Sequence, residues 1–386
     1  MLFDDLQRSD NWPMRYGETR YDFLNRSASA YFGMVRDLLE EWISHVPAND
    51  RADLAARLRG DNASHESAFW ELYLHEGYRR SGWALEVHPD VGQKTTHPDF
   101  LVTPPDGGPF FLEAIAVGKP RLDAGRERRL ADLQRLIDEL HFDHFVLWVD
   151  INSVGLQAPK SGQLRKDLRE WVAGLDPAVV AAAGQMGFRA LPRHRWEFGG
   201  WDMEFRALPL KSERQGQARH AIGVIGPGEA AVVDNVTPIQ RVLEVKQGRY
   251  GVLEAPLVIA VMSNTEIPTK PYEVDQALYG LSNRRPVNET WEPEDIFNNG
   301  FWRTKTGWRR GHCPQVIVAR GLSPWTAVRG APAVWNTYEP GVAAPAQPGW
   351  LSRGHAEGEP HEEPGSDTAI HFELDPKVWL GEPDFY

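Results

Sequence analysis

Three acidic residues, Glu71, Asp99 and Glu113, stand inside or at the start of otherwise apolar segments. Burying a carboxylate is costly unless a cation or a hydrogen-bond donor compensates its charge. Glu113 is the clearest case, because its surroundings read FFLEAIAV and are apolar on both sides. We therefore expect these acids to carry chemistry, and a divalent metal ion is the cation that neighbouring carboxylates are suited to hold.

A helix and three strands must position these acids. The apolar pattern predicts a helix near 65–80, which contains Glu71, and strands over 83–88, 98–102 and 110–117. The Pro-Pro-Asp-Gly-Gly turn at 104–108 joins the last two strands as a hairpin. Asp99 then opens the second strand and Glu113 lies within the third, so we expect their carboxylates to converge on one face.

Further elements are expected on both sides of this core. Helices are predicted over 18–45, 50–59, 121–140, 162–173, 237–250 and 273–281, and strands over 145–151, 257–262 and 315–319. Residues 339–368, rich in Pro, Gly and Glu, are typical of a flexible linker before one last strand. We expect an α/β fold with a mixed sheet flanked by helices.

These elements suggest four regions along the 386 residues. An N-terminal helical region covers 1–64, and an α/β core covers 65–263 with a large insertion at about 120–235. Residues 264–338 extend the core, and 339–386 form the linker and the terminal strand. A chain of this length is large enough to bury a substantial core.

Composition excludes several classes of protein. The net charge of −12 does not indicate nucleic-acid binding, although a local basic surface would be sufficient for such binding. Cys313 is the single cysteine, so no intrachain disulfide and no cysteine-based zinc site are expected. The N-terminal residues do not resemble a signal peptide, and no run approaches the ~18 apolar residues that span a membrane. We therefore expect a soluble, cytoplasmic protein without a membrane partner.

The acidic residues and their order resemble the core of the PD-(D/E)xK nuclease superfamily. The resemblance is carried by Pro98-Asp99 and, beyond the hairpin turn, by Glu113, with Glu71 on the preceding helix. Gln247-Gly-Arg-Tyr250 is similar to the QxxY motif of RecB-type members. The resemblance implies a restriction-endonuclease-like fold in a divergent bacterial member, and a metal-dependent nuclease acting on DNA in genome defence or repair.

The resemblance also implies a metal site. Asp99 and Glu113 would bind Mg²⁺ or Mn²⁺, with Glu71 assisting or helping to bind a second ion. Magnesium takes a few carboxylate oxygens and keeps several waters. The ion would polarise the scissile phosphate and lower the pKa of a bound water.

One position departs from the family pattern. The family places a lysine two residues after the strand acid, and this chain has Ile115 there. We expect Lys246 or Lys94 to supply the missing charge and to orient the attacking water, and we rank the two equally. Gln247 and Tyr250 would support the site or contact the nucleic-acid backbone.

A basic segment at 301–312 is the candidate surface for nucleic acid. Its predicted contact residues are Arg303, Lys305, Arg309, Arg310, Trp302 and Trp308. Arginine and lysine would bind phosphates, and the tryptophan rings would stack on bases. A solvated, structured loop is an equally good interpretation of the same residues.

Two other hypotheses remain open. The isoleucine at 115 favours a catalytically inactive nuclease-like module that binds nucleic acid or a protein partner. In the third hypothesis the acids are ordinary surface residues of a structural or interaction protein. The choice between DNA and RNA, the mode of cleavage and a homodimeric state also stay open.

Overall fold

The computed structural model describes residues 1–12, 14–91, 96–118, 124–216, 221–226, 234–265, 268–280, 283–287, 290–294, 299–304, 306–309, 311–327, 332–337, 339–356, 359–365 and 372. The chain divides into two compact units. Unit 1 comprises residues 1–11, 19–119 and 233–386, and unit 2 comprises residues 12–18 and 120–232.

The described helices are α1 (Arg20–Arg26), α2 (Ala30–His45), α3 (Ala48–Leu58), α4 (Asn62–Arg80), α5 (Ala124–Asp138), α6 (Ser161–Ala173), α7 (Pro177–Gln185), α8 (Val236–Gln247) and α9 (Pro271–Tyr279). The strands are β1 (Ala84–Val87), β2 (Phe100–Thr103), β3 (Phe110–Val117), β4 (Phe145–Ser153), β5 (Arg193–Phe198), β6 (Trp201–Pro209), β7 (Ile222–Gly226), β8 (Leu257–Ser263), β9 (Asn283–Val287), β10 (Thr290–Glu294), β11 (Arg303–Thr304), β12 (Gly307–Trp308), β13 (Gln315–Arg320), β14 (Ala333–Asn336), β15 (Leu351–Ala356) and β16 (Glu359–Glu363).

Unit 1 is built on an eight-stranded mixed sheet in the order β1-β2-β3-β8-β13-β14-β15-β16. β1, β2 and β3 are antiparallel neighbours, whereas β3, β8 and β13 run parallel to one another. Every residue of β8 is buried, as expected for a central strand covered on both faces. The expected mixed α/β sheet flanked by helices is therefore present.

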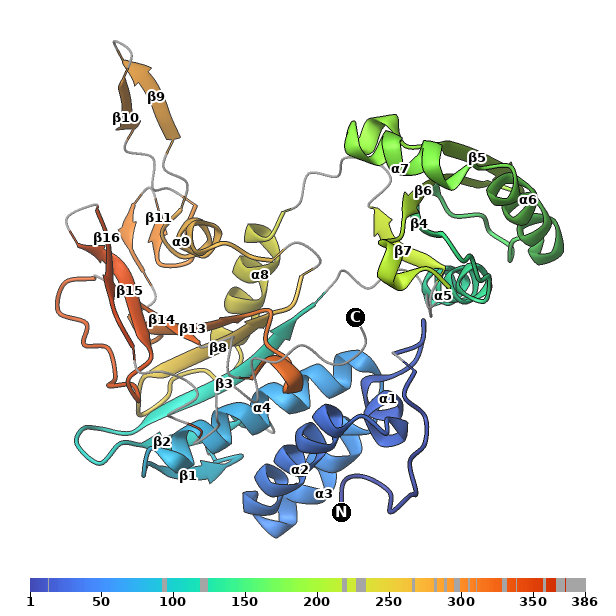
Figure 1. Ribbon diagram of the computed structural model, residues 1–386. Coiled ribbons are helices and arrows are strands. Elements are labelled where there is room, and N and C mark those ends of the chain that lie inside the picture. Colours follow the sequence, from blue (N-terminus) through green and yellow to red (C-terminus); the bar gives the residue numbers. More distant parts are fainter. Residues whose placement is uncertain are drawn as a thin grey trace. The chain divides into compact units, whose positions relative to one another are not determined.

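Helices cover both faces of this sheet (Figure 1). On one face, the Trp70 side chain of α4 donates a hydrogen bond to the Ala260 carbonyl of β8 over 2.9 Å. On the other face lie α8 and α9. Ile239 and Leu243 of α8 pack there against Ile259 of β8. Each buried aliphatic side chain of this kind contributes roughly 2 kcal/mol to stability.

The helix ends explain where α4 and α8 begin. Asp61 caps α4 by accepting a hydrogen bond from the Ser64 backbone N–H over 2.8 Å. At α8 the Asp234 carboxylate accepts from the backbone N–H groups of Val236 and Thr237, at 3.0 and 2.9 Å. Carboxylates in these places satisfy orphan donors and suit the positive end of the helix dipole.

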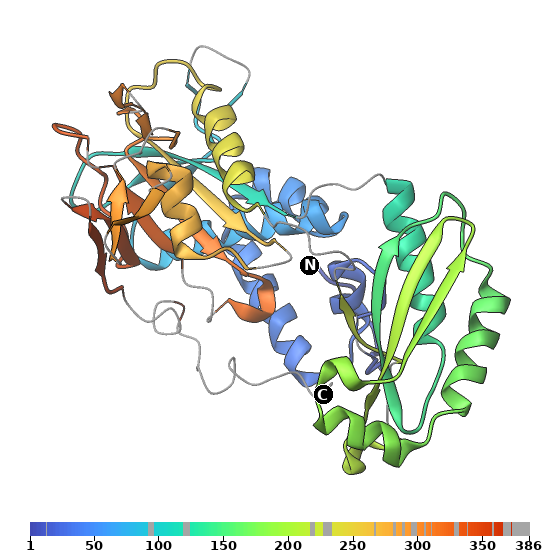
Figure 2. The same cartoon turned by 90° about the horizontal axis from the view of Figure 1, so that it is seen from above.

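Unit 2 has a separate four-stranded sheet, in the order β5-β6-β4-β7, and a core of its own (green in Figure 2). Along β6, buried and half-buried residues alternate, so one face of the sheet is apolar. α5, α6 and α7 pack on that face through Leu133, Leu168 and Val180, among others. The region predicted as an insertion thus contains a compact unit.

Several boundaries differ from the sequence-based expectation. The helix predicted over 18–45 is two helices, because Ser27 and Ser29 have extended backbones between α1 and α2. The helix predicted over 237–250 ends at Gln247, so that Tyr250 lies in the turn that follows.

The prediction of a flexible linker over 339–368 was wrong for its middle part. Residues 351–356 and 359–363 form β15 and β16, which pair with each other and extend the main sheet beyond β14. The sequence pattern missed them because sheet-edge strands can be polar and carry no apolar alternation. Of the terminal strand predicted near 369–376, only Phe372 is among the described residues, and it is buried.

None of the helices in the described part of the chain combines the length and the apolar character that a membrane crossing needs.

Buried His65 should make unit 1 less stable in mild acid. Its Nδ1 lies 2.6 Å from the Leu58 carbonyl, and among the described residues its Nε2 has no hydrogen-bond partner. Burial lowers the pKa of His65 to about 4. Below pH 6.5 His65 is therefore protonated in the unfolded chain but stays neutral in the folded chain, and the free energy of unfolding falls as the pH drops toward 4.

This effect can be measured by urea unfolding at pH 7.5 and pH 5.0. The His65→Asn variant keeps a donor for Leu58 but does not titrate, so its loss of unfolding free energy over this interval should be smaller by about 2 kcal/mol. Equal losses in the wild type and the variant would contradict the assignment.

Candidate active site

Glu113 is a carboxylate buried in the middle of the main sheet. It lies in β3, between β2 and β8, and only 1% of its surface is exposed. It belongs to the same strand face as Phe111 and Val117, which pack in the core beneath α8 and α9. The charge partners of Glu113 must therefore come from that side of the sheet.

Lys246 and Tyr250 supply those partners. The Lys246 ammonium group binds Oε1 of Glu113, and the Tyr250 hydroxyl donates a hydrogen bond to Oε2. Burial and the Glu113 charge raise the pKa of Tyr250, which keeps its hydroxyl protonated and able to donate. Both oxygens of the carboxylate are thus compensated by the end of α8 and the turn after it.

Arg249 adds a second cation at the same carboxylate. Its Nη1 lies 3.7 Å from Oε1 of Glu113, and its guanidinium carbon lies 6.0 Å from the centre of the Tyr250 ring. The chain reverses directly after α8, where the Arg249 N–H donates to the Lys246 carbonyl over 3.2 Å. This turn brings Arg249 and Tyr250 back towards β3.

Asp99 lies beside Glu113 at the start of β2. Phe100 pairs with Leu112, so continuing the antiparallel register by one residue places Asp99 opposite Glu113. Oδ2 of Asp99 accepts a hydrogen bond from the Ala114 backbone N–H over 2.7 Å. Burial, followed by the charges of Glu113 and Glu71, raises the pKa of Asp99 well above its ordinary value.

Glu71 is held by an arginine. It lies on α4, which covers the opposite face of the sheet from α8. Both of its oxygens accept from the Arg57 guanidinium of α3, at 2.6 and 2.5 Å. Arg57, Glu71 and His75 also line a cavity of about 20 Å³, which has room for roughly one water molecule. This cavity is too small for a nucleotide.

Gln247 is in contact with a histidine. Its Nε2 is within hydrogen-bond distance of Nε2 of His312, an exposed residue in the segment between β12 and β13. In this structure Gln247 joins α8 to that segment, whereas Tyr250 reaches the site itself.

Two of the described residues of the basic segment 301–312, Trp302 and Arg309, make contacts within the protein. Trp302 is fully buried and donates to the Cys313 carbonyl over 2.7 Å. The expectation that Trp302 stacks on bases was therefore wrong. Arg309 donates to the Phe301 carbonyl over 3.1 Å and pairs with Glu244 at 3.4 Å.

Arg303 and Trp308 remain at the surface of that loop. Both are half-buried, and the Arg303 guanidinium carbon lies 5.5 Å from the centre of the Trp308 ring. Lys94, Lys305 and Arg310 fall outside the described residues.

The donor set at β2 and β3 fits a hard divalent cation in part. Asp99 and Glu113 are neighbouring carboxylates, and a cation would offset the repulsion between them. The two oxygens of Glu113 already accept from Lys246 and Tyr250. Glu71 fits less well, because an ion there would compete with Arg57 for both oxygens.

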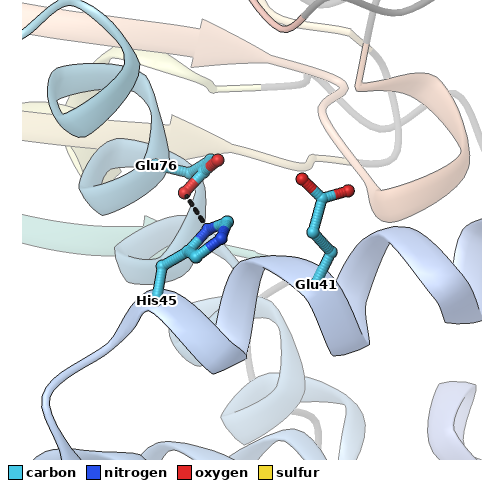
Figure 3. Close-up of side chains that lie close together, drawn as sticks. All are labelled: Glu41, His45 and Glu76. Carbon is cyan, nitrogen blue, oxygen red and sulfur yellow. Dashed lines mark hydrogen bonds and ion pairs between the residues drawn. The ribbon is translucent and has the colours of Figure 1, made fainter.

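A second group of side chains, Glu41, His45 and Glu76, also has the donor types of a metal site (Figure 3). Nδ1 of His45 lies 3.0 Å from Glu76. Glu76 is fully buried and accepts from Arg79 and Arg80 at 2.8 and 2.5 Å. Arg80 also binds Glu41 over 2.8 Å. Two arginines thus compensate the two carboxylates, and we interpret the group as an ion-pair network between α2 and α4.

Sequence reasoning missed three partners at these sites. Arg249 lies inside the 247–250 motif but had no assigned role, although a basic residue beside Tyr250, a predicted supporting residue of the site, was a usable signal. Arg57 and His312 gave no signal, because their contacts with Glu71 and Gln247 depend on tertiary packing.

Comparison of the chain with protein-family models, with curated proteins and with solved structures yields no significant match.

Substitutions of Lys246 and Glu113 should have strongly non-additive effects on the free energy of unfolding. Lys246→Met leaves a buried carboxylate short of a cation and should lower the free energy of unfolding by about 3 kcal/mol. Adding Glu113→Gln removes the uncompensated charge, so the double variant should lose less than the sum of the two single losses. Urea unfolding of the four proteins measures this coupling.

The exposed pair of Lys166 and Glu170, at 3.8 Å, provides the matched control. The corresponding cycle of Lys166→Met and Glu170→Gln should show a coupling below about 1 kcal/mol. If the losses of unfolding free energy at Lys246 and Glu113 are additive, the contact between the two side chains does not contribute to stability.

Glu76 should prove more important for stability than Glu41. Glu76→Gln weakens three contacts in the buried network and should lower the free energy of unfolding by about 2 kcal/mol. Glu41 is half-exposed, and Glu41→Gln should lower it by less than about 1 kcal/mol. Burial raises the pKa of Glu76, but the hydrogen bonds to Arg79, Arg80 and His45 together lower it by more. The pKa of Glu76 is therefore below its ordinary value. Its contribution is therefore present above the ordinary glutamate pKa and is lost in stronger acid.

Urea unfolding at pH 7 measures both variants, and unfolding at pH 3.5 tests the linkage. The gap between wild type and Glu76→Gln should narrow at the lower pH. An unchanged gap would argue against ionised Glu76 as the source of the stability.

Proposed function

We propose that the chain is a metal-dependent nuclease of the PD-(D/E)xK type, with a restriction-endonuclease-like core, that hydrolyses phosphodiester bonds in DNA. In this proposal Asp99 and Glu113 hold Mg²⁺ or Mn²⁺, and Lys246 takes the role of the lysine that the strand lacks at Ile115. The same fold also supports functions other than hydrolysis, so the proposal depends on the site rather than on the sheet.

The contact between Lys246 and Glu113 carries the proposal. A lysine two residues after Glu113 on β3 would lie on the same strand face, and Ile115 occupies that place. Lys246 reaches the same carboxylate from α8. A buried acid of the core strand, a second acid opposite it and a lysine amine are therefore close together, and these are the groups that the proposed metal-assisted hydrolysis would use.

Each residue has a distinct part in this proposal. A bound divalent ion would polarise the phosphate and make a bound water more acidic. Lys246, at 16% side-chain exposure, can donate hydrogen bonds both to Glu113 and to a water or phosphate oxygen outside it. Tyr250 fixes the orientation of the Glu113 carboxylate. Glu71, paired with Arg57, would influence Asp99 through its charge.

A second candidate function is a non-cleaving module that binds nucleic acid. It is favoured by one observation: both oxygens of Glu113 already accept from Lys246 and Tyr250. If these contacts persist when cations are present, the carboxylate stays closed to a metal, and the same basic residues would only bind phosphate.

The two functions separate in a cleavage assay on single-stranded DNA, duplex DNA and RNA with Mg²⁺ or Mn²⁺. For a nuclease, Glu113→Gln, Asp99→Asn and Lys246→Met should each lower the cleavage rate by about 100-fold or more. Lys166→Met, at an exposed lysine of unit 2, is the matched control and should cleave as the wild type does.

Calorimetry with Mn²⁺ gives a second measurement that does not require turnover. The wild type should bind the ion, and Asp99→Asn and Glu113→Gln should bind it at least about tenfold more weakly. Binding of nucleic acid without cleavage or metal binding would select the second function. Cleavage that survives Glu113→Gln would refute the assigned site.

A further inference from the structure

Arg249 occupies the outer position in the group of cations at Glu113. Side-chain exposure rises from 2% for Glu113 to 16% for Lys246 and 44% for Arg249. Arg249 is therefore the most exposed of the three charged groups that meet at Glu113.

The contact of Arg249 with Glu113 is not needed to compensate the carboxylate. Lys246 and Tyr250 already bind the two oxygens of Glu113. The separation of 3.7 Å for Arg249 is longer than a hydrogen bond. A half-exposed ion pair at this distance contributes little to stability.

The backbone fixes where the guanidinium can reach. Arg249 lies in the tight turn after α8, between Lys246, whose carbonyl accepts its N–H, and Tyr250, whose hydroxyl is fixed on Glu113. Gly251 follows with a φ of 75°, a left-handed conformation that glycine adopts without strain. The turn thus holds the Arg249 guanidinium near the Glu113 carboxylate, at 3.7 Å, with 44% of the side chain exposed.

We infer that Arg249 binds a backbone phosphate of the nucleic acid at the entrance of the Glu113 site. A guanidinium offers a planar fork of donors that matches two phosphate oxygens. Because the Arg249 side chain is more exposed than that of Lys246, we assign it to a phosphate that is held in place rather than to the reacting group. This inference rests on the proposed function, and it adds a substrate-positioning residue to it.

The test measures binding rather than turnover. Fluorescently labelled single-stranded DNA, duplex DNA and RNA of about 20 nucleotides, a length chosen to exceed one binding site, are titrated in EDTA at several KCl concentrations. Arg249→Gln should weaken binding about tenfold and reduce the slope of log affinity against log salt by about one. Arg249→Lys should retain the slope and recover part of the affinity, because it keeps the charge but loses the fork.

Arg169→Gln is the control for net charge, because Arg169 is an exposed arginine on α6 of unit 2. It should leave both affinity and slope unchanged, and an equal effect in the two variants would overturn the inference. Thermal unfolding of Arg249→Gln distinguishes a structural role. A large loss of Tm with unchanged affinity and slope would also overturn it.

The outcomes separate this inference from the proposed function. If the wild type cleaves and Arg249→Gln binds with the same affinity and slope, the inference fails and the nuclease proposal stands. If the wild type binds none of the three nucleic acids, the inference fails together with the proposal that supports it.

Discussion

The buried charge of Glu113 is the constraint around which unit 1 is arranged. β3 lies inside the sheet, so water cannot compensate this carboxylate and the partners must come from the chain. α8 can supply Lys246 only because Ile239 and Leu243 hold it against the same sheet face. Apolar packing and charge compensation are therefore two consequences of one helix position, and neither is sufficient without the other.

The buried glutamates of the described chain, Glu71, Glu76 and Glu113, are all paired with basic side chains, but not in the same way. Glu71 is bound by Arg57 of α3, and Glu76 by two arginines at the end of its own helix. The Arg57 contact joins α3 to α4, and the contact of Glu76 with His45 joins α4 to α2. Glu113 differs because its cationic partners, Lys246 and Arg249, come from the other side of the sheet and are 16% and 44% exposed.

The sequence was informative where a local pattern reported burial. FFLEAIAV and LVIAVM predicted β3 and β8, and the apolar positions of 237–250 placed α8 with Lys246 on it. Tertiary partners left no such pattern. The two hydrogen bonds from Arg57 to Glu71 and the burial of Trp302 cannot be predicted from the spacing of residues in the sequence. Each depends on elements that meet only in the folded chain. The polar strands β15 and β16, at one end of the sheet, were missed for a related reason: their pairing, not their composition, makes them strands.

The position of unit 2 in the chain has a consequence for the order of synthesis. Glu113 and Lys246 are 133 residues apart, and nearly all of the residues between them belong to unit 2. The whole of unit 2 leaves the ribosome before α8 does, so it has time to fold while Glu113 still lacks its partners. A folded insert also replaces a long flexible loop, which reduces the entropy that closing β3 onto α8 must overcome. We therefore expect the folding of unit 2 to favour the later contact of Glu113 with Lys246, although unit 2 contributes no residue to the contacts described at this site.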